Sequence, residues 1–88
     1  MDPYSLHFKK SAEKDLRKIP REILPHIFEH IEDLAAEPVP HDAYKLASAE
    51  HLYRIRTGDY RVIYQVLHET REVVVYYIRH RSVAYRGL

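Results

Sequence analysis

Cysteine is absent from this sequence of 88 residues. Its absence excludes a disulfide framework, a thiolate metal site and a cysteine nucleophile. A long hydrophobic run is also missing, and the first ten residues mix charged with apolar side chains, which is not the pattern of a secretory signal. We therefore expect a cytoplasmic protein that has no membrane segment.

The chain also lacks any internal repeat, linker or low-complexity tract that would divide it. Compact domains typically contain about 50 to 200 residues, so this length leaves no room for a second hydrophobic core. The composition is 45% hydrophobic and 31% charged, which is too apolar for a disordered chain. We expect one folded domain over residues 1–88, with one active surface.

Acidic residues are scarce in the second half of the sequence, although the net charge of the whole chain is only +1. Residues 1–51 hold seven Lys and Arg against ten Asp and Glu, whereas residues 52–88 hold seven basic residues against three acids. Every basic residue of the second half is arginine, which binds phosphate through two hydrogen bonds and stacks on nucleobases. This set fits an RNA-binding surface, although a solvated sheet edge would have the same composition.

The first half of the sequence has the pattern of a strand followed by two helices. Residues 4–9 alternate apolar and polar side chains, as a half-buried strand does. Apolar residues then recur at helical spacing in a short helix capped by Ser11, and again in a second helix over residues 21–36. Pro25 lies near the start of this helix, whose regular part therefore either begins close to Ile23 or has a bent first turn.

The second half of the sequence has the pattern of β-strands. Segments 52–56 and 60–67 are predicted to pair as a hairpin. Residues 73–78 are apolar on both faces, as in a strand inside a sheet, and residues 79–88 are predicted to form a basic tail. The whole pattern predicts an α+β fold, in which an antiparallel two-helix hairpin covers one face of a small, mainly antiparallel sheet and the arginines occupy the other.

The register of the predicted hairpin decides where its arginines point. Side chains two apart on a strand share a face, so Arg54 and Arg56 point the same way. Pairing of Arg56 with Arg61 would place all three on one side, whereas pairing of Arg56 with Tyr60 would turn Arg61 to the reverse face. We predict the first register, with a turn from Thr57 to Tyr60.

Three strings follow one another along the sequence. They are Ala12-x-x-Asp15-Leu16-x-Lys18-Ile19-Pro20, Tyr53-Arg54-Ile55-Arg56-x-Gly58-Asp59-Tyr60-Arg61-Val62-Ile63-Tyr64 and Arg79-His80-Arg81-x-x-x-Tyr85. A Gly-Asp-Tyr-Arg string alone would occur by chance, but the order of all three resembles that of the RelE/ParE toxins of type II toxin–antitoxin systems. The similarity covers nearly the whole chain.

The superfamily contains two kinds of toxin that share one fold. Members similar to RelE cleave messenger RNA bound to the small ribosomal subunit, and they carry basic residues on the hairpin and an arginine followed by a tyrosine near the C-terminus. This sequence matches the hairpin positions with Arg54, Arg56 and Arg61, and the C-terminal pair with Arg81 and Tyr85. The resemblance therefore implies a ribosome-dependent endoribonuclease that cuts mRNA in the A site without a metal or organic cofactor.

The sequence departs from the RelE pattern in two ways. Arginines stand at positions 54 and 56, where lysines can stand in RelE-type toxins, and this leaves the proton-transfer roles open. The sequence also ends soon after Tyr85, which shortens the C-terminal element. The alternative is a toxin similar to ParE that poisons DNA gyrase and does no chemistry of its own, and a third possibility is a non-toxic relative that serves as a DNA-binding corepressor.

RNA carries its own nucleophile, the 2′-OH, so a nuclease has to align it with the phosphorus, take its proton and stabilise the charge that develops. Arginine suits the last task but not proton transfer, because its pKa lies above about 12. The roles that follow are transition-state stabilisation by Arg61 and Arg81 and phosphate binding by Arg54 and Arg56.

Histidine and tyrosine are the side chains left for proton transfer. We expect His80 or Tyr85 to move the proton, with His68 a weaker candidate. Tyr85 could instead stack on a base beside the scissile bond. Lys45 and Arg79 could extend the phosphate track.

The remaining histidines and tyrosines fit structural roles better than chemical ones. His26 and His30 lie four apart on one helix, but no third ligand is near in sequence, so we expect a solvent-facing pair and no metal site. We expect core or cross-strand packing for five tyrosines, which are Tyr53, Tyr60, Tyr64, Tyr76 and Tyr77.

The resemblance also implies the partners of the protein. A toxin of this kind acts on the ribosome and mRNA and is held inactive by a RelB-like antitoxin in a hetero-oligomer. Such antitoxins are typically disordered in part and fold on their toxin, which lets a small inhibitor cover a broad surface.

Overall fold

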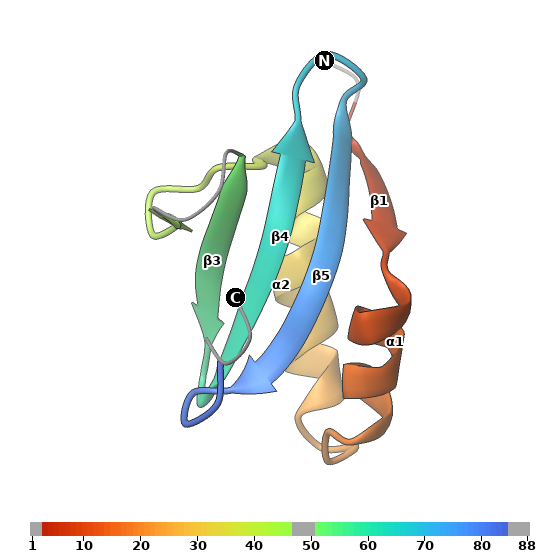
Figure 1. Cartoon of the computed structure of the whole chain (residues 1–88), viewed down its shortest axis with the longest axis vertical. Helices are drawn as coiled ribbons and strands as arrows, with labels where there is room; N and C mark the ends of the chain where they lie inside the picture. The colour runs from red at the N-terminus through yellow and green to blue at the C-terminus, as the bar shows by residue number, and fades with distance from the viewer. Residues whose placement is uncertain (1–2, 47–50, 85–88) are drawn as a thin grey trace.

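The computed structural model describes residues 3–46 and 51–84. The strands form one five-stranded sheet in the order β1-β5-β4-β3-β2, in which β1 runs parallel to β5 and every other neighbouring pair is antiparallel (Figure 1). The elements are β1 (Ser5–Phe8), α1 (Lys10–Arg17), α2 (Leu24–Ala36), β2 (Tyr44–Lys45), β3 (Leu52–Thr57), β4 (Tyr60–Leu67) and β5 (Glu72–His80). This is the α+β architecture predicted from the sequence.

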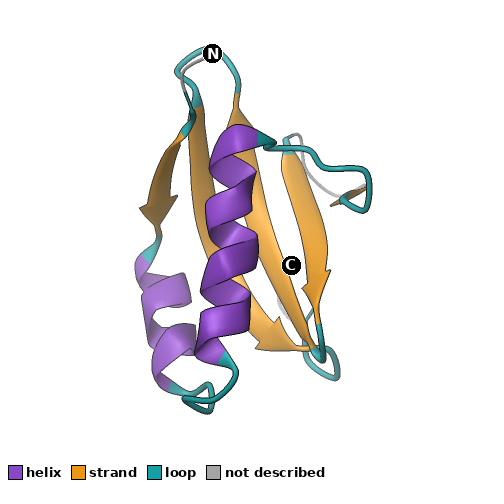
Figure 2. Ribbon diagram, turned by 180° about the vertical axis from the view of Figure 1, so that it is seen from behind, coloured by secondary structure: helices purple, strands orange, loops and turns teal. Residues whose placement is uncertain are grey.

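Both helices lie on one side of the sheet, with α2 running across its centre (Figure 2). The apolar stripe of α2 is fully buried against side chains that β3, β4 and β5 point inward, and no described helix covers the opposite face of the sheet. No helix among residues 3–46 and 51–84 is long and apolar enough to cross a membrane. The core includes Ile27, Ile31, Leu34, Ile55, Val62, Tyr64, Val66, Val73, Val75 and Ile78.

The short helix α1 supplies hydrogen-bond partners to backbone groups at the edge of β5, beyond the end of β1. The parallel pairing of β1 with β5 stops at Phe8 opposite Val75. Beyond that point the Ser11 hydroxyl donates a hydrogen bond of 2.5 Å to the Tyr76 carbonyl, and the Ile78 amide donates one of 3.0 Å to the Asp15 carboxylate. Polar side chains of the helix therefore take over the edge hydrogen bonds that a strand would make.

The predicted cap at Ser11 is wrong, because α1 begins at Lys10, two residues before the start that a cap at Ser11 implies, and Ser11 bonds to β5 instead. The residue at the N-cap is Lys9, and it makes no side-chain capping bond. The second helix starts at Leu24, three residues later than predicted, with Ile23 as its N-cap. Pro25 lies in the first turn, where the missing amide would have had no partner in the helix. The helix therefore begins directly after Ile23, as the first of the two alternatives predicted.

Strand β5 is longer than its apolar sequence predicted. It runs from Glu72 to His80, so Arg79 and His80 belong to the sheet and not to a basic tail. A bulge between the Ile63–Tyr77 and Tyr64–Val75 pairs shifts the register by one residue, and β5 stays paired with β4 up to His80. Backbone hydrogen bonds to β4 hold these two residues in the strand whatever the polarity of their side chains.

Tyrosines fill the core as expected at three positions. The Tyr64 ring is fully buried and stacks on Tyr53 with 5.9 Å between ring centroids, and Tyr60 packs against the same cluster. The Tyr64 hydroxyl donates a hydrogen bond of 2.7 Å to the Pro38 carbonyl. Burial, aided by the nearby Tyr53 and Asp42, raises the pKa of this hydroxyl well above its ordinary value. Tyr64 is thus a neutral, hydrogen-bonded part of the core.

Candidate functional site

Arginines from three adjacent strands form one row on the side of the sheet that carries no helix. Arg56 of β3 pairs with Arg61 of β4, and Arg61 pairs with Arg79 of β5. Since neighbouring strands lie about 4.8 Å apart, these three side chains leave the sheet next to one another. Arg54 stands two residues before Arg56 and shares its face. We call these four residues, Arg54, Arg56, Arg61 and Arg79, the arginine face.

The hairpin register that produces this face is the one predicted. Ile55 and Thr57 alternate with the arginines of β3 and are buried on the helix side. The Arg56–Arg61 pair is followed by a Thr57–Tyr60 pair, so the connecting loop is Gly58 and Asp59. Gly58 has a φ of +59°, which suits glycine at the first central position of a two-residue hairpin turn.

Arg61 occupies the middle of the row and is 7% exposed. Its Nη1 donates hydrogen bonds to the carbonyls of Gly58, at 3.1 Å, and of Tyr60, at 3.0 Å. Both acceptors are neutral, and the cross-strand neighbours Arg56 and Arg79 carry the same charge. Like charges opposite one another destabilise a sheet. A row of this kind would be stabilised by an anionic ligand.

Arg56 is the solvent-facing member of the row. Its side chain is exposed, and within the described part of the chain no hydrogen bond or ion pair holds its guanidinium. All of its donors are therefore available to a ligand, and guanidinium donors match two oxygens of one phosphate.

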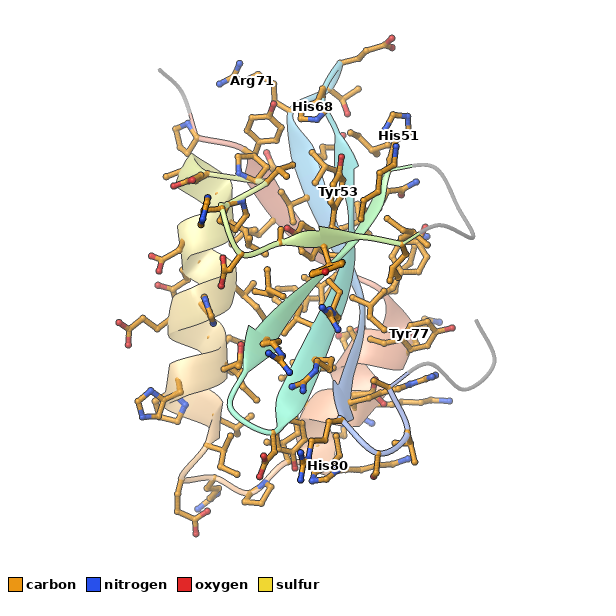
Figure 3. All side chains as sticks on the ribbon, turned by 90° about the vertical axis from the view of Figure 1, so that its left-hand side faces the viewer. His51, Tyr53, His68, Arg71, Tyr77 and His80 are labelled. Carbon is orange, nitrogen blue, oxygen red and sulfur yellow. The ribbon has the colours of Figure 1, made fainter. Side chains whose placement is uncertain are left out.

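Aromatic rings support the outer arginines. The guanidinium of Arg79 lies 3.8 Å from the centroid of the Tyr77 ring, and that of Arg54 lies 4.7 Å from the centroid of the Tyr44 ring. Figure 3 shows Tyr77 on the side of the sheet away from α2. Cation–π contacts of this kind hold a guanidinium against the ring.

Tyr76 and Tyr77 reach this face because of the bulge in β5. Val75 and Ile78 both point into the core, so the two tyrosines between them both point outward. Each is half-buried, and the Tyr76 hydroxyl bonds to Gln65 at 3.2 Å. The cross-strand packing predicted for them is present, but it lies on the arginine face and not in the core.

Arg81 follows β5 at the same end of the sheet. Its backbone amide donates a hydrogen bond of 2.7 Å to the Asp59 carbonyl, and its Nε lies 3.9 Å from the Asp59 carboxylate. Arg61 bonds to Gly58 in the same turn. The hairpin turn thus brings Arg61 and Arg81 to one end of the molecule, as the candidate site requires.

His80 lies on the other side of the sheet from the arginine row. It pairs with Tyr60, whose ring packs against the core, and the two rings meet edge to face with 5.6 Å between centroids. Its Nδ1 lies 2.9 Å from the Ser82 hydroxyl oxygen. Figure 3 places His80 at the end of the sheet. Side chains alternate along β5, so His80 and Arg79 point in opposite directions.

Two further predicted site residues are not seen on the arginine face. Lys45 is exposed on β2 and pairs with Tyr53, which faces the core, so its side chain leaves the sheet on the helix side. Tyr85 lies outside the described residues.

Tyr44 was missed by the sequence analysis. It pairs with Arg54, lies on the arginine face and is 66% exposed. Its strand, β2, has only two residues, too few to show an alternating pattern. The signal that could have found it is an aromatic residue beside Lys45 in an otherwise polar connection.

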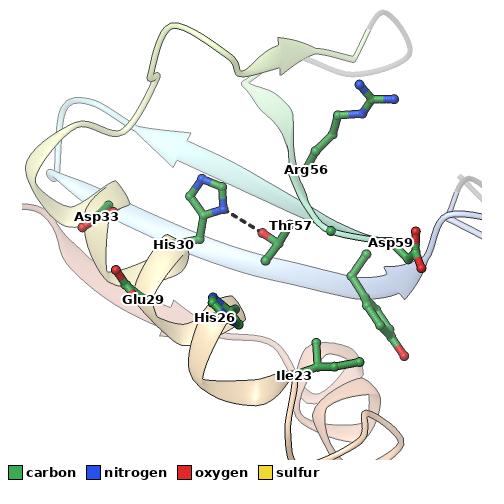
Figure 4. Close-up of a pocket in the computed structure, with 10 residues that line it drawn as sticks. Ile23, His26, Glu29, His30, Asp33, Arg56, Thr57 and Asp59 are labelled. Atoms are coloured by element: carbon green, nitrogen blue, oxygen red, sulfur yellow. Dashed lines mark hydrogen bonds between the residues drawn. The ribbon is translucent and has the colours of Figure 1, made fainter.

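A groove of about 710 Å³ lies between α2 and the hairpin, with Arg56 part of its lining (Figure 4). His30 Nδ1 and Thr57 Oγ1 form a hydrogen bond of 2.8 Å across it. The predicted solvent-facing pair is therefore wrong for His30, which is half-buried, whereas His26 is exposed. Across residues 3–46 and 51–84, no three His, Asp or Glu side chains are grouped as metal ligands. The hydrogen bond fastens α2 to β3.

Known proteins resemble this chain over almost its full length. A family model described as the ParE toxin of type II toxin–antitoxin system, parDE, matches residues 6–85. Toxin RelG of Mycobacterium tuberculosis is 32% identical over 85 residues, which cover 96% of this chain and 98% of RelG.

Solved structures with the same architecture carry related names. One chain of the archaeal RelE–RelB complex from Pyrococcus horikoshii has a TM-score of 0.80 and 32% identity, over 93% of this chain and 99% of that one. The isolated RelE toxin of E. coli has a TM-score of 0.77 and 26% identity, over 96% and 87%.

Proposed function

Because this chain belongs to the RelE/ParE toxin superfamily of type II toxin–antitoxin systems, we propose that it is an endoribonuclease that cuts mRNA in the ribosomal A site. The observation that carries the proposal is the row of Arg56, Arg61 and Arg79 on the open side of the sheet, with Arg81 at its end. The row presents positive charge where an extended RNA backbone can reach it.

The arginines supply positive charge to the transition state. Attack of the 2′-OH on the adjacent phosphorus puts additional negative charge on the phosphate oxygens, and donors that are already in place stabilise it best. Two backbone carbonyls orient Arg61, so its guanidinium needs little rearrangement when the substrate binds. Arg56 and Arg81 are exposed and grip the phosphate from either side. In this proposal arginines do what metal ions do in many other nucleases.

Proton transfer falls to a residue other than arginine. His80 points to the other side of the sheet from Arg79, and this favours Tyr85, the residue that the RelE resemblance also indicates. We propose that Tyr85 takes part in proton transfer or stacks beside the scissile bond. Tyr85→Phe would preserve stacking and lose proton transfer, whereas Tyr85→Ala would lose both.

We also propose a RelB-like antitoxin as the partner of this toxin. The Pyrococcus horikoshii relative was solved as a complex with RelB, and so were relatives from E. coli and Methanococcus jannaschii. Binding of an antitoxin would hold the protein inactive until the antitoxin is removed.

Mapping the 5′ ends of cellular mRNA after brief induction tests the proposal. We expect new ends inside translated regions, in register with codons. The single variants Arg56→Ala and Arg81→Ala should each lower cleavage about 100-fold or more, the usual effect of removing one transition-state donor. Arg21→Ala, which removes an exposed arginine before α2, should cut like the parent protein.

Two results would contradict the nuclease function. Intact transcripts together with damaged DNA would indicate a gyrase-directed toxin. Equal cleavage by the parent and by both arginine variants would show that the arginine face and its neighbour do not hold the substrate.

A further inference from the structure

We propose that Tyr44 stacks on a base of the bound RNA, so that Tyr44 and Arg54 form a base-binding subsite at the β2 end of the arginine face. The inference rests on the proposed function, because it concerns how the same face holds its substrate. Three observations carry it, which are the exposure of the Tyr44 ring, its contact with Arg54 and its place in the sheet.

Tyr44 is unusually exposed for an aromatic residue in this protein. At 66% it exceeds Phe28, at 36%, and Val39, at 41%, the other exposed large hydrophobic residues in the described part of the chain. Tyrosine rings are usually half-buried or buried, and an exposed ring forgoes the free energy of leaving water. The exposed ring therefore marks a place where a ligand could bind.

Arg54 fixes the orientation of the ring. Its guanidinium carbon lies 4.7 Å from the centroid of Tyr44, so a cation covers one face of the ring. Two thirds of the residue nevertheless remain accessible. A ring held on one side and open on the other is a stacking platform, and every nucleobase has a π-face to offer it.

The sheet places this platform within reach of a bound phosphate. Tyr44 lies directly across from Arg54, and Arg54 is two residues from Arg56 on the same strand. Residues two apart on a strand are separated by about 7 Å. A base on Tyr44 and a phosphate at Arg56 can thus belong to neighbouring nucleotides of one RNA strand.

The surroundings of Tyr44 favour RNA over an apolar protein segment. The exposed side chain of Arg56 on β3 lies on the same face and is cationic, and the guanidinium of Arg54 already lies on the ring. An apolar helix would have to cover these charges, whereas a polyanion with flat bases would be attracted by them.

Cleavage in a translating extract tests the subsite. We expect Tyr44→Ala to lower cleavage about ten-fold or more, the scale of losing one stacked base. Tyr44→Phe keeps the ring and should stay within about two-fold of the parent, and so should Phe28→Ala, an exposed aromatic on the helix side. Tyr44→Ala with parental cleavage would overturn the subsite and leave the nuclease function standing.

A fluorescence experiment separates the two proposals. The chain contains no tryptophan, so Tyr44→Trp introduces a single indole at the subsite, which can be excited apart from the tyrosines. A short 2′-O-methyl RNA, which lacks the nucleophile and cannot be cut, should quench its emission by stacking. Quenching by this RNA supports the subsite even if the parent protein cuts no mRNA. Absence of cleavage by the parent would contradict the nuclease function alone.

Absence of quenching by RNA at low salt would overturn the subsite whatever the cleavage result. Loss of antitoxin binding by Tyr44→Ala together with parental cleavage would also overturn it, because the ring would then belong to a protein contact. Thermal unfolding of each variant checks that the fold is intact.

Discussion

At the scale of single residues, Arg61 shows how a candidate site can oppose stability. It is buried, lies between two other arginines, and donates hydrogen bonds to the neutral carbonyls of Gly58 and Tyr60. Replacing such a charge commonly stabilises a protein at the expense of activity. The row persists in the folded state because the rest of the core stabilises the sheet that carries it.

Tyr64 makes the stability of the protein depend on alkaline pH. Burial raises the pKa of its hydroxyl above the ordinary value of about 10, so the folded protein keeps a proton that the unfolded chain loses. This contribution to stability is complete below about pH 10 and is lost as the pH rises toward the folded pKa. We expect the free energy of unfolding, measured in urea, to fall above about pH 10, and Tyr64→Phe to flatten that fall.

Tyr64→Phe should also change stability below pH 10, where the tyrosine hydroxyl keeps its proton in both states. Phenylalanine cannot bond to the Pro38 carbonyl, so below pH 10 the variant should be less stable than the parent by about 1 kcal/mol. Parallel pH profiles of the two proteins above pH 10 would show that Tyr64 does not cause the alkaline loss.

At the scale of secondary-structure elements, polar side chains of α1 bond to the β5 edge beyond the end of β1. Asp15→Ala leaves the part-buried amide of Ile78 without its acceptor, and an unsatisfied buried donor costs about 1–3 kcal/mol. We expect that loss in the free energy of unfolding by urea. Glu13→Ala, at an exposed position of the same helix, should change stability by less than about 0.5 kcal/mol. Equal effects of the two substitutions would contradict a role for Asp15 at this edge.

The sequence predicted elements well where side-chain pattern and backbone pairing agree. Alternation in β3 and β4 and the Gly58-Asp59 turn gave the correct hairpin register, and with it three members of the arginine face. The end of β5 was wrong because Arg79 and His80 look like a tail until β4 is placed beside them. Strand β2 was missed because two residues are too few to show the alternation of apolar and polar side chains that marks a strand.

The candidate site was predictable to a similar extent. The side of the sheet on which the hairpin arginines lie followed from the register alone, since successive side chains of a strand point to opposite faces. The bulge that turns Tyr77 toward Arg79 was not visible, because a single inserted residue leaves no mark in an apolar run. The position of His80 depends on the same bulge, so the sequence could not show on which side of the sheet it lies.

At the scale of the whole molecule, arginines gather on the side of the sheet that carries no helix, whereas acidic and basic side chains are mixed on the other side. The helices expose the carboxylates of α2 together with the lysines and the arginine of α1, so a net charge of +1 conceals a basic surface on one face. Such a distribution orients a polyanion as it approaches. The exposed acids of α2 are Glu29, Glu32 and Asp33.

Salt dependence measures how many of these arginines touch phosphate. We expect the affinity for a short 2′-O-methyl RNA, followed by fluorescence anisotropy, to fall steeply as salt rises. Arg56→Ala should lessen the slope of log K against log salt by about 0.7, the contribution of one phosphate contact in single strands. Arg21→Ala should leave the slope unchanged, and an identical slope for Arg56→Ala would exclude a phosphate contact there.

The parallel pairing of β1 with β5 also decides when the sheet and its arginine face can be complete. Ser5 aligns with Glu72, so β1 has no strand to pair with until β5 has been synthesised. Contacts this distant in sequence form late, after long loops have closed. A nascent chain still held by its own ribosome short of β5 has neither a closed sheet nor Arg79. Under the proposed function, such a chain could not yet hold RNA on the arginine face.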